Sequence, residues 1–228
     1  MKAVILAAGR GSRMKPLTDN KPKPLLVIRG KSFLERTIDA LLESGEITEF
    51  IIIIGTFGDQ IVSFVKDCYP DLIVNFVEQQ ELSGTGSALM LTESFFSNRE
   101  RFVVCYADEY FTGEDVLNCL KYDYSWLSLI VPLPERSAEP TVDKNGKIIS
   151  IIEKPENPKT NRVLGGLMVV NSDIFEYSVE LHPTKKEYYL SEMVGKFLIV
   201  NDVYIVHAVY NFSFSTAVEV EQFNKMNQ

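Results

Sequence analysis

A short apolar run that stops abruptly in small residues constrains this chain most. Residues 3–6 are Ala-Val-Ile-Leu, and they predict a buried strand. Residues 7–11 are Ala-Ala-Gly-Arg-Gly. Because Ala7, Ala8, Gly9 and Gly11 have no large side chain, backbone N–H groups there can face a ligand at close range. We therefore expect an α/β fold with a ligand site where this first strand ends.

The same loop concentrates positive charge in an acidic protein. The 228-residue chain carries a net charge of −8, yet seven Lys or Arg residues lie between Gly9 and Lys31, with Asp19 as the only acid. This contrast indicates a focused anion site, although a solvated basic loop is the alternative. Lys23 stands between two prolines, which favour an extended backbone on both sides and aim its side chain. The acidic balance argues against nucleic acid as a partner.

Two common phosphate motifs do not fit this loop. The dinucleotide fingerprint needs a third glycine where the chain has Met14, and the Walker A spacing is absent. No acid follows the second predicted strand at Gly55-Thr56, which further disfavours a dinucleotide oxidoreductase.

Apolar patterns alternate after the loop. Ser32 with Glu35 forms a capping-box pattern that opens a helix, and Gly45 ends it. Strands are predicted at 50–54 and 72–77, with a helix at 61–68 between them. This order implies a parallel sheet with helices on both sides. Later residues predict strands at 126–131 and 163–170, and a hairpin that turns near residues 145–146.

The segment from Leu6 to Ile28 resembles the signature LxxGxGxRLxPLTxxxPKPLLxI of the sugar-1-phosphate nucleotidyltransferases, or pyrophosphorylases. The resemblance extends over about residues 1–225. It implies an α/β fold with a Rossmann-like, mixed but mostly parallel sheet and helices on both faces (the nucleotidyltransferase GT-A-like fold). We expect a single domain over 1–228, with a nucleotide-binding half at about 1–125 and an acceptor-binding half at about 126–228.

The resemblance implies a nucleotide site built from two segments. Gln79 to Ala88 is similar to the family's base-binding segment Q-x-x-x-x-GT-G/A-x-A. The amide of Gln79 has donors and acceptors that can recognise a base edge, although a glycine-rich helix cap would explain the same residues. UTP, dTTP or CTP is expected over ATP and GTP. The implied nucleotide-binding residues are Leu6, Ala7, Ala8, Gly9, Gly11, Ser12, Arg13, Gln79, Gly84 and Thr85.

The family also has a Gly-Asp pair whose Asp binds a metal. Here the pair is Ala107-Asp108, at the end of the apolar run 102–106. The resemblance implies Mg²⁺ as the cofactor, Asp108 as its ligand, and Arg13, Lys23 and Asp108 as the catalytic residues. Glu109 is expected to be solvated, with a second oxygen ligand as the alternative. The family's second metal-binding Asp corresponds to Ser213, with Asn211 nearby.

Glu153-Lys154-Pro155 is similar to the family's EKP element, whose Glu binds sugar hydroxyls and whose Lys approaches the acceptor phosphate. Gly166 matches a strand beside the sugar, and residues 187–194 resemble a segment flanking it. Glu153, Lys154 and Gly166 are therefore the implied acceptor-binding residues. A surface ion pair is the alternative for the first two. Ala138 is nearest to a position where the family usually has a sugar-contacting glycine.

These features imply an enzyme of nucleotide-sugar biosynthesis that joins a nucleoside triphosphate to a sugar 1-phosphate and releases pyrophosphate. Two alternatives stay open. One is a nucleotide-binding regulatory or inactive homologue, motivated by Ser213. The other is a cytidylyltransferase for a non-sugar phosphate such as phosphocholine. The oligomeric state cannot be read from the sequence.

Cellular location is inferred from absent patterns and from cysteine usage. No run of about 20 apolar residues predicts a membrane span, and the N-terminus lacks a signal-peptide layout. Cys68, Cys105 and Cys119 lie in apolar contexts and are predicted to be reduced core thiols. We therefore expect a cytoplasmic protein. The chain ends without the acyltransferase extension of some relatives, so a single activity is expected.

Overall fold

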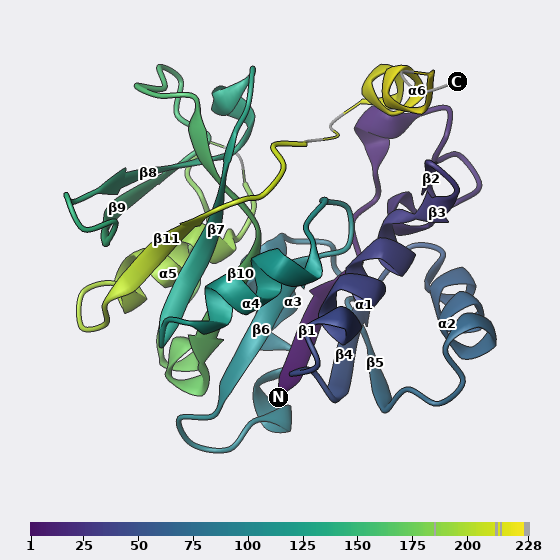
Figure 1. Ribbon diagram of the computed structural model, residues 1–228, viewed down its shortest axis with the longest axis horizontal. Helices are drawn as coiled ribbons and strands as arrows, with labels where there is room; N and C mark the ends of the chain where they lie inside the picture. The colour runs from purple at the N-terminus through teal and green to yellow at the C-terminus, as the bar shows by residue number, and fades with distance from the viewer. Residues whose placement is uncertain (185, 213, 215, 226–228) are drawn as a thin grey trace.

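The computed structural model describes residues 1–184, 186–212, 214 and 216–225. Its centre is a seven-stranded sheet in the order β11-β7-β10-β6-β1-β4-β5 (Figure 1). The strands are β1 Lys2–Leu6, β4 Glu49–Ile54, β5 Val74–Glu78, β6 Arg101–Tyr106, β7 Tyr124–Ile130, β10 Arg162–Asn171 and β11 Val203–His207. All neighbouring strands are parallel except β10, which runs antiparallel to β6 and β7. The predicted mixed, mostly parallel sheet is confirmed.

Helices cover both faces of this sheet. They are α1 Phe33–Glu43, α2 Gly58–Cys68, α3 Thr85–Met90, α4 Gly113–Leu120, α5 Leu190–Phe197 and α6 Ala217–Lys225. Because neighbouring strand residues point to opposite faces, Ala3 and Ile5 pack with α1, α2 and α4, whereas Val4 packs with α3 and α5. The expected helices on both faces are therefore present.

Local sequence signals set the bounds of α1. The Glu35 backbone N–H donates to Ser32 Oγ at 3.1 Å, and the Ser32 N–H donates to Glu35 Oε2 at 3.2 Å, which completes the predicted capping box. The helix ends before Gly45, whose φ of +71° suits glycine. Its buried face includes Leu34, Ile38 and Leu41, in agreement with the helical spacing of these residues.

The second half adds a hairpin, as predicted. Strands β8 Ala138–Val142 and β9 Ile148–Glu153 pair antiparallel, and the turn between them contains Gly146 at φ +82°. Asp143 Oδ1 accepts hydrogen bonds from two backbone N–H groups of this turn, Asn145 at 2.8 Å and Lys147 at 2.9 Å. The remaining short elements are β2 Val27–Ile28, β3 Lys31–Ser32 and the 3-10 turns η1 Ser12–Met14, η2 Lys23–Leu25, η3 Glu93–Phe95, η4 Pro134–Arg136 and η5 Ser172–Glu176.

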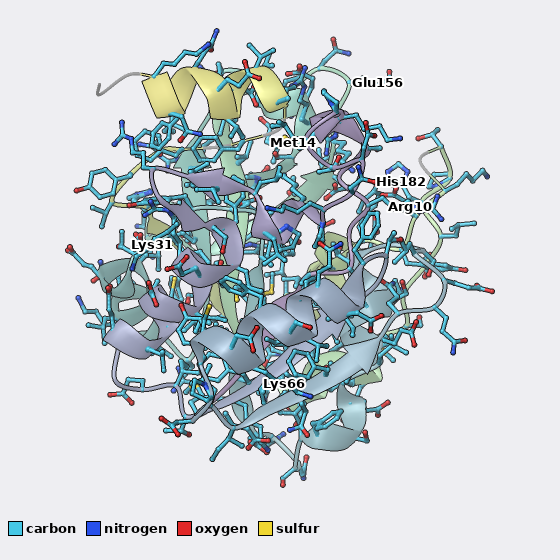
Figure 2. The ribbon with its side chains drawn as sticks, turned by 90° about the vertical axis from the view of Figure 1, so that its right-hand side faces the viewer. Arg10, Met14, Lys31, Lys66, Glu156 and His182 are labelled. Atoms are coloured by element: carbon cyan, nitrogen blue, oxygen red, sulfur yellow. The ribbon has the colours of Figure 1, made fainter. Side chains whose placement is uncertain are left out.

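Helix α6 returns to the first part of the chain and lies beside β2 and β3 (Figure 1). Its Val220 and Phe223 pack with Met14 and Phe33, and Figure 2 shows Met14 near α6. The last described helix therefore packs against the loop that follows β1.

The cysteine prediction is partly wrong. Cys105 and Cys119 are buried, but Cys68 is exposed at the end of α2. Its spacing of seven positions from Ile61 puts it on the buried face of an ideal helix, but Cys68 is the last residue of α2 and lies beyond the part of that face that is buried. Within the described part of the chain, no helix is long and apolar enough to cross a membrane.

Candidate active site

An open cleft of about 530 Å³ lies at the carboxyl ends of β1 and β6. It brings together residues from the first loop, the segment at 79–88, the end of β6, and the strands β8 and β9. Parallel strands deliver their carboxyl ends to one edge of the sheet, which explains why distant segments meet there. The predicted site residues that line the cleft are Leu6, Ala7, Ala8, Gly9, Ser12, Arg13, Lys23, Gln79, Gly84, Thr85, Asp108, Glu153 and Lys154.

Gly11 and Gly166 support the cleft without lining it. Gly11 has a φ of +61°, and a Cβ there would lie 2.9 Å from the Cβ of Lys23. A Cβ on Gly166 would lie 3.0 Å from the Cβ atoms of both Tyr106 and Glu109. Each glycine therefore permits a close approach between chain segments, which is a packing role.

Lys23 is held in the cleft by two oxygen atoms. Its Nζ donates to Asp108 Oδ2 at 2.8 Å and to the Phe214 carbonyl at 2.9 Å. The Lys23 side chain is only 12% exposed. The backbone is extended at Pro22, as expected, but Lys23–Leu25 forms a 3-10 turn, so the prediction of an extended chain on both sides is wrong. A 3-10 turn starting at Lys23 is compatible with Pro24, because proline fits the first turn of a helix.

Asp108 and Glu109 differ in their surroundings. The Asp108 side chain is 38% exposed and faces the cleft, where it pairs with Lys23. Glu109 Oε2 accepts a hydrogen bond from the Gly166 backbone N–H at 2.7 Å. The expectation that Glu109 is solvated is therefore wrong, because its side chain is half-buried in the lining of the cleft and is bonded to β10.

The chemistry of Glu109 follows from these surroundings. Burial, followed by the nearby negative charge of Asp108, raises the pKa of Glu109 to about 7, against the opposing effects of Lys23 and the Gly166 amide. A carboxyl group with this pKa is only partly ionised at neutral pH.

The residues present fit a metal that takes few protein ligands. Among the described residues, no group of three or more His, Cys, Asp or Glu side chains is placed to hold a metal ion. Asp108 nevertheless offers a partly exposed carboxylate in the cleft. Mg²⁺ commonly uses one or two carboxylates, with phosphates and waters as its other ligands, so this donor set suits Mg²⁺ bound together with a phosphate ligand.

The second metal position falls outside this description. Ser213 lies outside the described residues. Asn211 is described, and its Oδ1 accepts a hydrogen bond from the Ile130 backbone N–H at 2.7 Å. Asn211 therefore bonds the end of β7, and it does not line the cleft that contains Asp108.

The segment that begins at Gln79 has a structural role as well as a place in the cleft. The Gln79 side chain is almost buried, and its Nε2 donates to the Gly84 carbonyl and to Ser87 Oγ, each at 3.1 Å. These bonds use both amide hydrogens, so the Gln79 carbonyl oxygen is the atom left to recognise a base. The glycine-rich cap and the base-binding interpretation are compatible.

The same segment is bonded to residues 188–190. The Tyr188 N–H donates to the Ser83 carbonyl and the Gly86 N–H donates to the Tyr188 carbonyl, both at 2.8 Å. Gly84 has a φ of +124°, and a Cβ there would lie 2.4 Å from the Tyr188 carbonyl oxygen. These two segments are far apart in the sequence, whereas the fold joins them into one wall of the cleft.

Lys154 is held by an aromatic side chain. Its Nζ donates to the Tyr189 hydroxyl at 2.8 Å and lies 4.2 Å from the centre of that ring. Glu153 Oε1 is 3.7 Å from Lys154 Nζ, and Glu187 Oε2 is 4.0 Å from it. The backbone φ of Lys154 is +45°, which is uncommon for a residue with a side chain.

Glu153 is bonded to α5. Its Oε2 accepts a hydrogen bond from Ser191 Oγ at 2.7 Å. Burial raises the pKa of Glu153, while the Ser191 hydroxyl and the charge of Lys154 oppose that rise. The alternative of a solvated surface pair does not describe Glu153 and Lys154, since their side chains are 10% and 25% exposed.

Sequence reasoning missed several residues of the cleft. Arg136 lines it from the turn before β8 and forms no ion pair with any described residue. Tyr106 and Trp126 also line it, and Trp126 Nε1 donates to the Gly165 carbonyl at 2.6 Å. A lone arginine in a loop and an aromatic residue in a strand give no local signal of a site, so only the tertiary structure identifies them.

The charges of the cleft suit two anionic groups bound at different positions. Five cationic side chains line it, and four carboxylates are interspersed among them. Arg10 and Arg13 extend from the first loop, whereas Lys154 and Arg136 lie with β8 and β9. This arrangement can bind a polyphosphate beside the first loop and a second phosphate near Lys154.

Comparison with known proteins gives a family. The family described as "Nucleotidyl transferase" matches residues 2–199. The bifunctional protein GlmU of Methanocaldococcus jannaschii is 34% identical over 176 residues, which are 77% of this chain and 41% of that protein. The UTP–glucose-1-phosphate uridylyltransferase AglF of Haloferax volcanii is 29% identical, over 85% of this chain and 82% of that protein. This chain thus spans less than half of the GlmU protein.

Solved structures agree with this assignment. A crystal structure from Bacillus anthracis in complex with sucrose, described as a glucose-1-phosphate thymidylyltransferase, superposes with a TM-score of 0.82 at 28% identity, and the match covers 98% of this chain and 94% of that one. A UDP-glucose pyrophosphorylase bound to UDP-glucose superposes with a TM-score of 0.79 at 18% identity, which supports the fold alone. Its signature loop, its mixed sheet and the match over residues 2–199 show that this chain belongs to the sugar-1-phosphate nucleotidyltransferase family.

Proposed function

We propose that this protein transfers a nucleotidyl group from UTP, dTTP or CTP to a sugar 1-phosphate and releases pyrophosphate. The observation that supports this most strongly is the pairing of Lys23 with Asp108 at 2.8 Å in a cleft that Glu153 and Lys154 also line. A cation and a carboxylate thus lie on one side of the cleft, and Lys154, which would bind the acceptor phosphate, lies on the other.

The reaction needs positioning more than acid–base chemistry. An oxygen of the acceptor phosphate attacks the α-phosphorus, a new P–O bond forms, and the bond between the α-phosphorus and the bridging oxygen breaks as pyrophosphate leaves. A phosphate monoester has a second pKa of about 6, so it is mostly dianionic at neutral pH. No general base is required, and the barrier falls through alignment and charge stabilisation.

The residues of the first loop would bind the triphosphate. Arg13 and the backbone from Gly9 to Ser12 would hold the β- and γ-phosphates. Lys23 would neutralise charge that develops on the α-phosphoryl oxygens. Its present partner Asp108 keeps the ammonium group in the cleft, so Lys23 needs only a small movement to exchange one oxygen ligand for another.

Asp108 would hold Mg²⁺ through its carboxylate. When bound, Mg²⁺ supplies charge neutralisation on the phosphate oxygens. The Asp108 carboxylate would then interact with both Lys23 and Mg²⁺, so a change at one cation would affect the other. Glu109 would stay with Gly166, because its hydrogen bond to β10 already fixes its position.

The acceptor would bind between β9 and α5. Lys154 can exchange the Tyr189 hydroxyl for an acceptor phosphate oxygen while keeping contact with the ring. Glu153, oriented by Ser191 at 2.7 Å, would accept hydrogen bonds from hydroxyl groups of the acceptor. The similarity to AglF, a UTP–glucose-1-phosphate uridylyltransferase, and to the glucose-1-phosphate thymidylyltransferase supports a sugar 1-phosphate and a pyrimidine nucleotide.

A substrate matrix tests the proposal. Five nucleoside triphosphates, including dTTP, are combined with glucose 1-phosphate, N-acetylglucosamine 1-phosphate and phosphocholine, and pyrophosphate release is measured with and without Mg²⁺. We expect release with a pyrimidine nucleotide and a sugar phosphate. A preference for GTP or for phosphocholine would contradict the proposed substrates.

Binding without transfer would contradict the enzyme assignment. The single Trp126 lies in the cleft, so its fluorescence reports binding independently of turnover. Nucleotide-dependent quenching with no pyrophosphate from any pair would favour a binding module.

A further inference from the structure

We propose that the C-terminal strap positions Lys23 for catalysis and is therefore part of the active site. The strap is defined as the described residues 212, 214 and 216–225, which include α6. It lies beyond the family match, which ends at residue 199. The inference rests on the proposed function, because it assigns a role to the strap through the proposed catalytic lysine.

The strap contributes one atom directly to Lys23. The Phe214 carbonyl oxygen accepts a hydrogen bond from Lys23 Nζ at 2.9 Å, while Asp108 Oδ2 accepts another at 2.8 Å. The carbonyl is neutral and belongs to the backbone. It can therefore keep its bond to the ammonium group when the Asp108 carboxylate is engaged elsewhere.

An aromatic cluster fixes the position of that carbonyl. The Phe214 ring is 5% exposed and contacts Phe33 edge-on at 5.4 Å and Phe223 edge-on at 5.0 Å between ring centres. Phe212 also packs against Phe223, at 4.8 Å. Phe33 begins α1, and the centre of its ring lies 6.0 Å from Lys23 Nζ. The ring of Phe214 is thus buried beside the lysine that its carbonyl binds.

The docking of α6 is specified by the backbone of the β2–β3 turn. Asn224 Oδ1 accepts a hydrogen bond from the Arg29 N–H at 2.8 Å, and Asn224 Nδ2 donates to the Val27 carbonyl at 3.2 Å. The Arg29 guanidinium lies 4.0 Å from the centre of the Phe223 ring. An asparagine that bonds two backbone groups fixes both the position and the orientation of the helix.

These contacts form a continuous series that begins and ends at Lys23. The chain leads from Lys23 through η2 to Val27 and Arg29, Asn224 joins that turn to α6, and Phe223 joins α6 to Phe214. A shift of α6 would move the carbonyl that holds Lys23, although no strap residue needs to contact the substrate. The strap residues are thus positioning residues, and their loss should lower kcat more than it raises KM.

The test uses the full chain and the exposed residue Asn224. Asn224→Ala removes both bonds to the turn and Asn224→Asp retains the one that its oxygen accepts. Asn118→Ala is the control, since Asn118 is a half-buried asparagine on α4 that bonds only Lys121 among the described residues. We expect Asn224→Ala to lower kcat roughly tenfold, less than the hundredfold that a misplacement of about 1 Å can cost. KM values should stay within about twofold, and Asn224→Asp should lie between the alanine variant and wild type.

A second pair of variants tests the buried anchor. Phe214→Leu keeps an apolar side chain and should retain most of the wild-type kcat. Phe214→Ala should lower kcat to an extent similar to that of Asn224→Ala. All rates are measured below the melting temperature of each variant. Wild-type kcat in Asn224→Ala, or a rise in KM equal to the fall in kcat, would overturn the inference and leave the strap as a cover for the core.

A chemical readout separates this inference from the proposed function. Lys23 and Lys31 are labelled with an acylating reagent and quantified in the same digest. Asn224→Ala should increase the labelling of Lys23 relative to Lys31, because Lys23 loses an oxygen partner. This holds whether or not transfer is detected, so wild-type inactivity would contradict only the proposed function. Unchanged labelling of Lys23 would contradict the strap.

Discussion

Two lysines face the same cleft, but their partners differ. Lys23 on the proposed donor side pairs with the Asp108 carboxylate at 2.8 Å and with a backbone carbonyl. Lys154 on the proposed acceptor side donates to the neutral hydroxyl of Tyr189 at 2.8 Å, with carboxylate oxygens no closer than 3.7 Å among those of Glu153 and Glu187. One lysine is held mainly by charge, and the other by a neutral hydrogen bond and an aromatic ring.

This difference suggests different functional consequences. Lys23 shares its counterion with the proposed metal site, so a change in either partner alters the charge available at the α-phosphate. Lys154 can release a neutral hydroxyl without leaving a separated charge behind. We therefore expect donor-side changes to act mainly on kcat and acceptor-side changes to act mainly on the acceptor KM.

The largest effect is expected from Asp108→Asn. An asparagine oxygen can accept a hydrogen bond from Lys23 but provides no negative charge for Lys23 or for Mg²⁺. Transfer should fall on the order of 10³-fold, the upper range for loss of one preorganised electrostatic contact. The measurement is the initial rate over a Mg²⁺ titration.

Asp19→Asn is the control for Asp108→Asn. Asp19 is exposed in the basic stretch and pairs with Lys15 at 3.4 Å, and it does not line the cleft among the described residues. Its titration should match wild type. An unchanged titration for Asp108→Asn would place the metal elsewhere, with Glu109 as the first alternative.

Lys23→Ala is expected to have the next largest effect. Removal of one fixed cation should lower kcat roughly 10²-fold, with a smaller change in either KM. Lys31→Ala is the control, because Lys31 also pairs with a carboxylate, that of Asp39, but lies on the opposite side of the molecule from Arg10 (Figure 2). Equal kcat values for Lys23→Ala and wild type would contradict the donor side of the comparison.

Lys154→Ala should show the opposite kinetic pattern. Loss of a charged hydrogen bond to the acceptor phosphate should raise the acceptor KM roughly tenfold, with kcat less affected. Tyr189→Phe keeps the ring and removes only the hydroxyl, so it should leave the acceptor KM near wild type. A fall in kcat with an unchanged acceptor KM in Lys154→Ala would show that both lysines act on the same step.

Gln79→Ala should alter base discrimination by a smaller amount. If the Gln79 carbonyl oxygen recognises the base, the ratio of kcat/KM between the preferred pyrimidine nucleotide and ATP should fall roughly fivefold, as for one neutral hydrogen bond. Ser87→Ala is a matched control, since it removes a loop partner of Gln79 without removing that oxygen. Equal losses of discrimination in both variants would indicate that Gln79 acts only by shaping the loop.

The smallest effect concerns stability and Glu109. Because its pKa in the folded protein is raised to about 7, the folded state binds a proton there that the unfolded chain has already released. The stabilising contribution is therefore present at low pH and is lost as the pH rises through the folded pKa. In the presence of a chelator, the wild-type melting temperature should fall relative to Glu109→Gln between about pH 5 and pH 7.5. Parallel curves for the two proteins would contradict this assignment.

Local sequence determined much of the fold. The Ser32–Glu35 capping box, the glycine after α1 and the turn at residues 145–146 all depend on contacts within a few residues, and all were predicted. The alternation of strands and helices likewise predicted the sheet, since periodicity reports which face of each element is buried. The loop from Leu6 to Ile28 was sufficient to identify the family, because its glycines, prolines and cations form one continuous pattern.

The tertiary structure alone decided the partners of the site residues. Glu109 was expected to be solvated, but the Gly166 N–H of β10, 57 positions away, binds its carboxyl group. The Phe214 carbonyl meets Lys23 across 191 positions, and Tyr189 meets Lys154 across 35. Backbone carbonyls are the same in every residue, and the burial of a carboxyl group depends on whichever segment covers it. Such contacts leave no local pattern in the sequence, because they exist only once the sheet has brought distant segments to one edge.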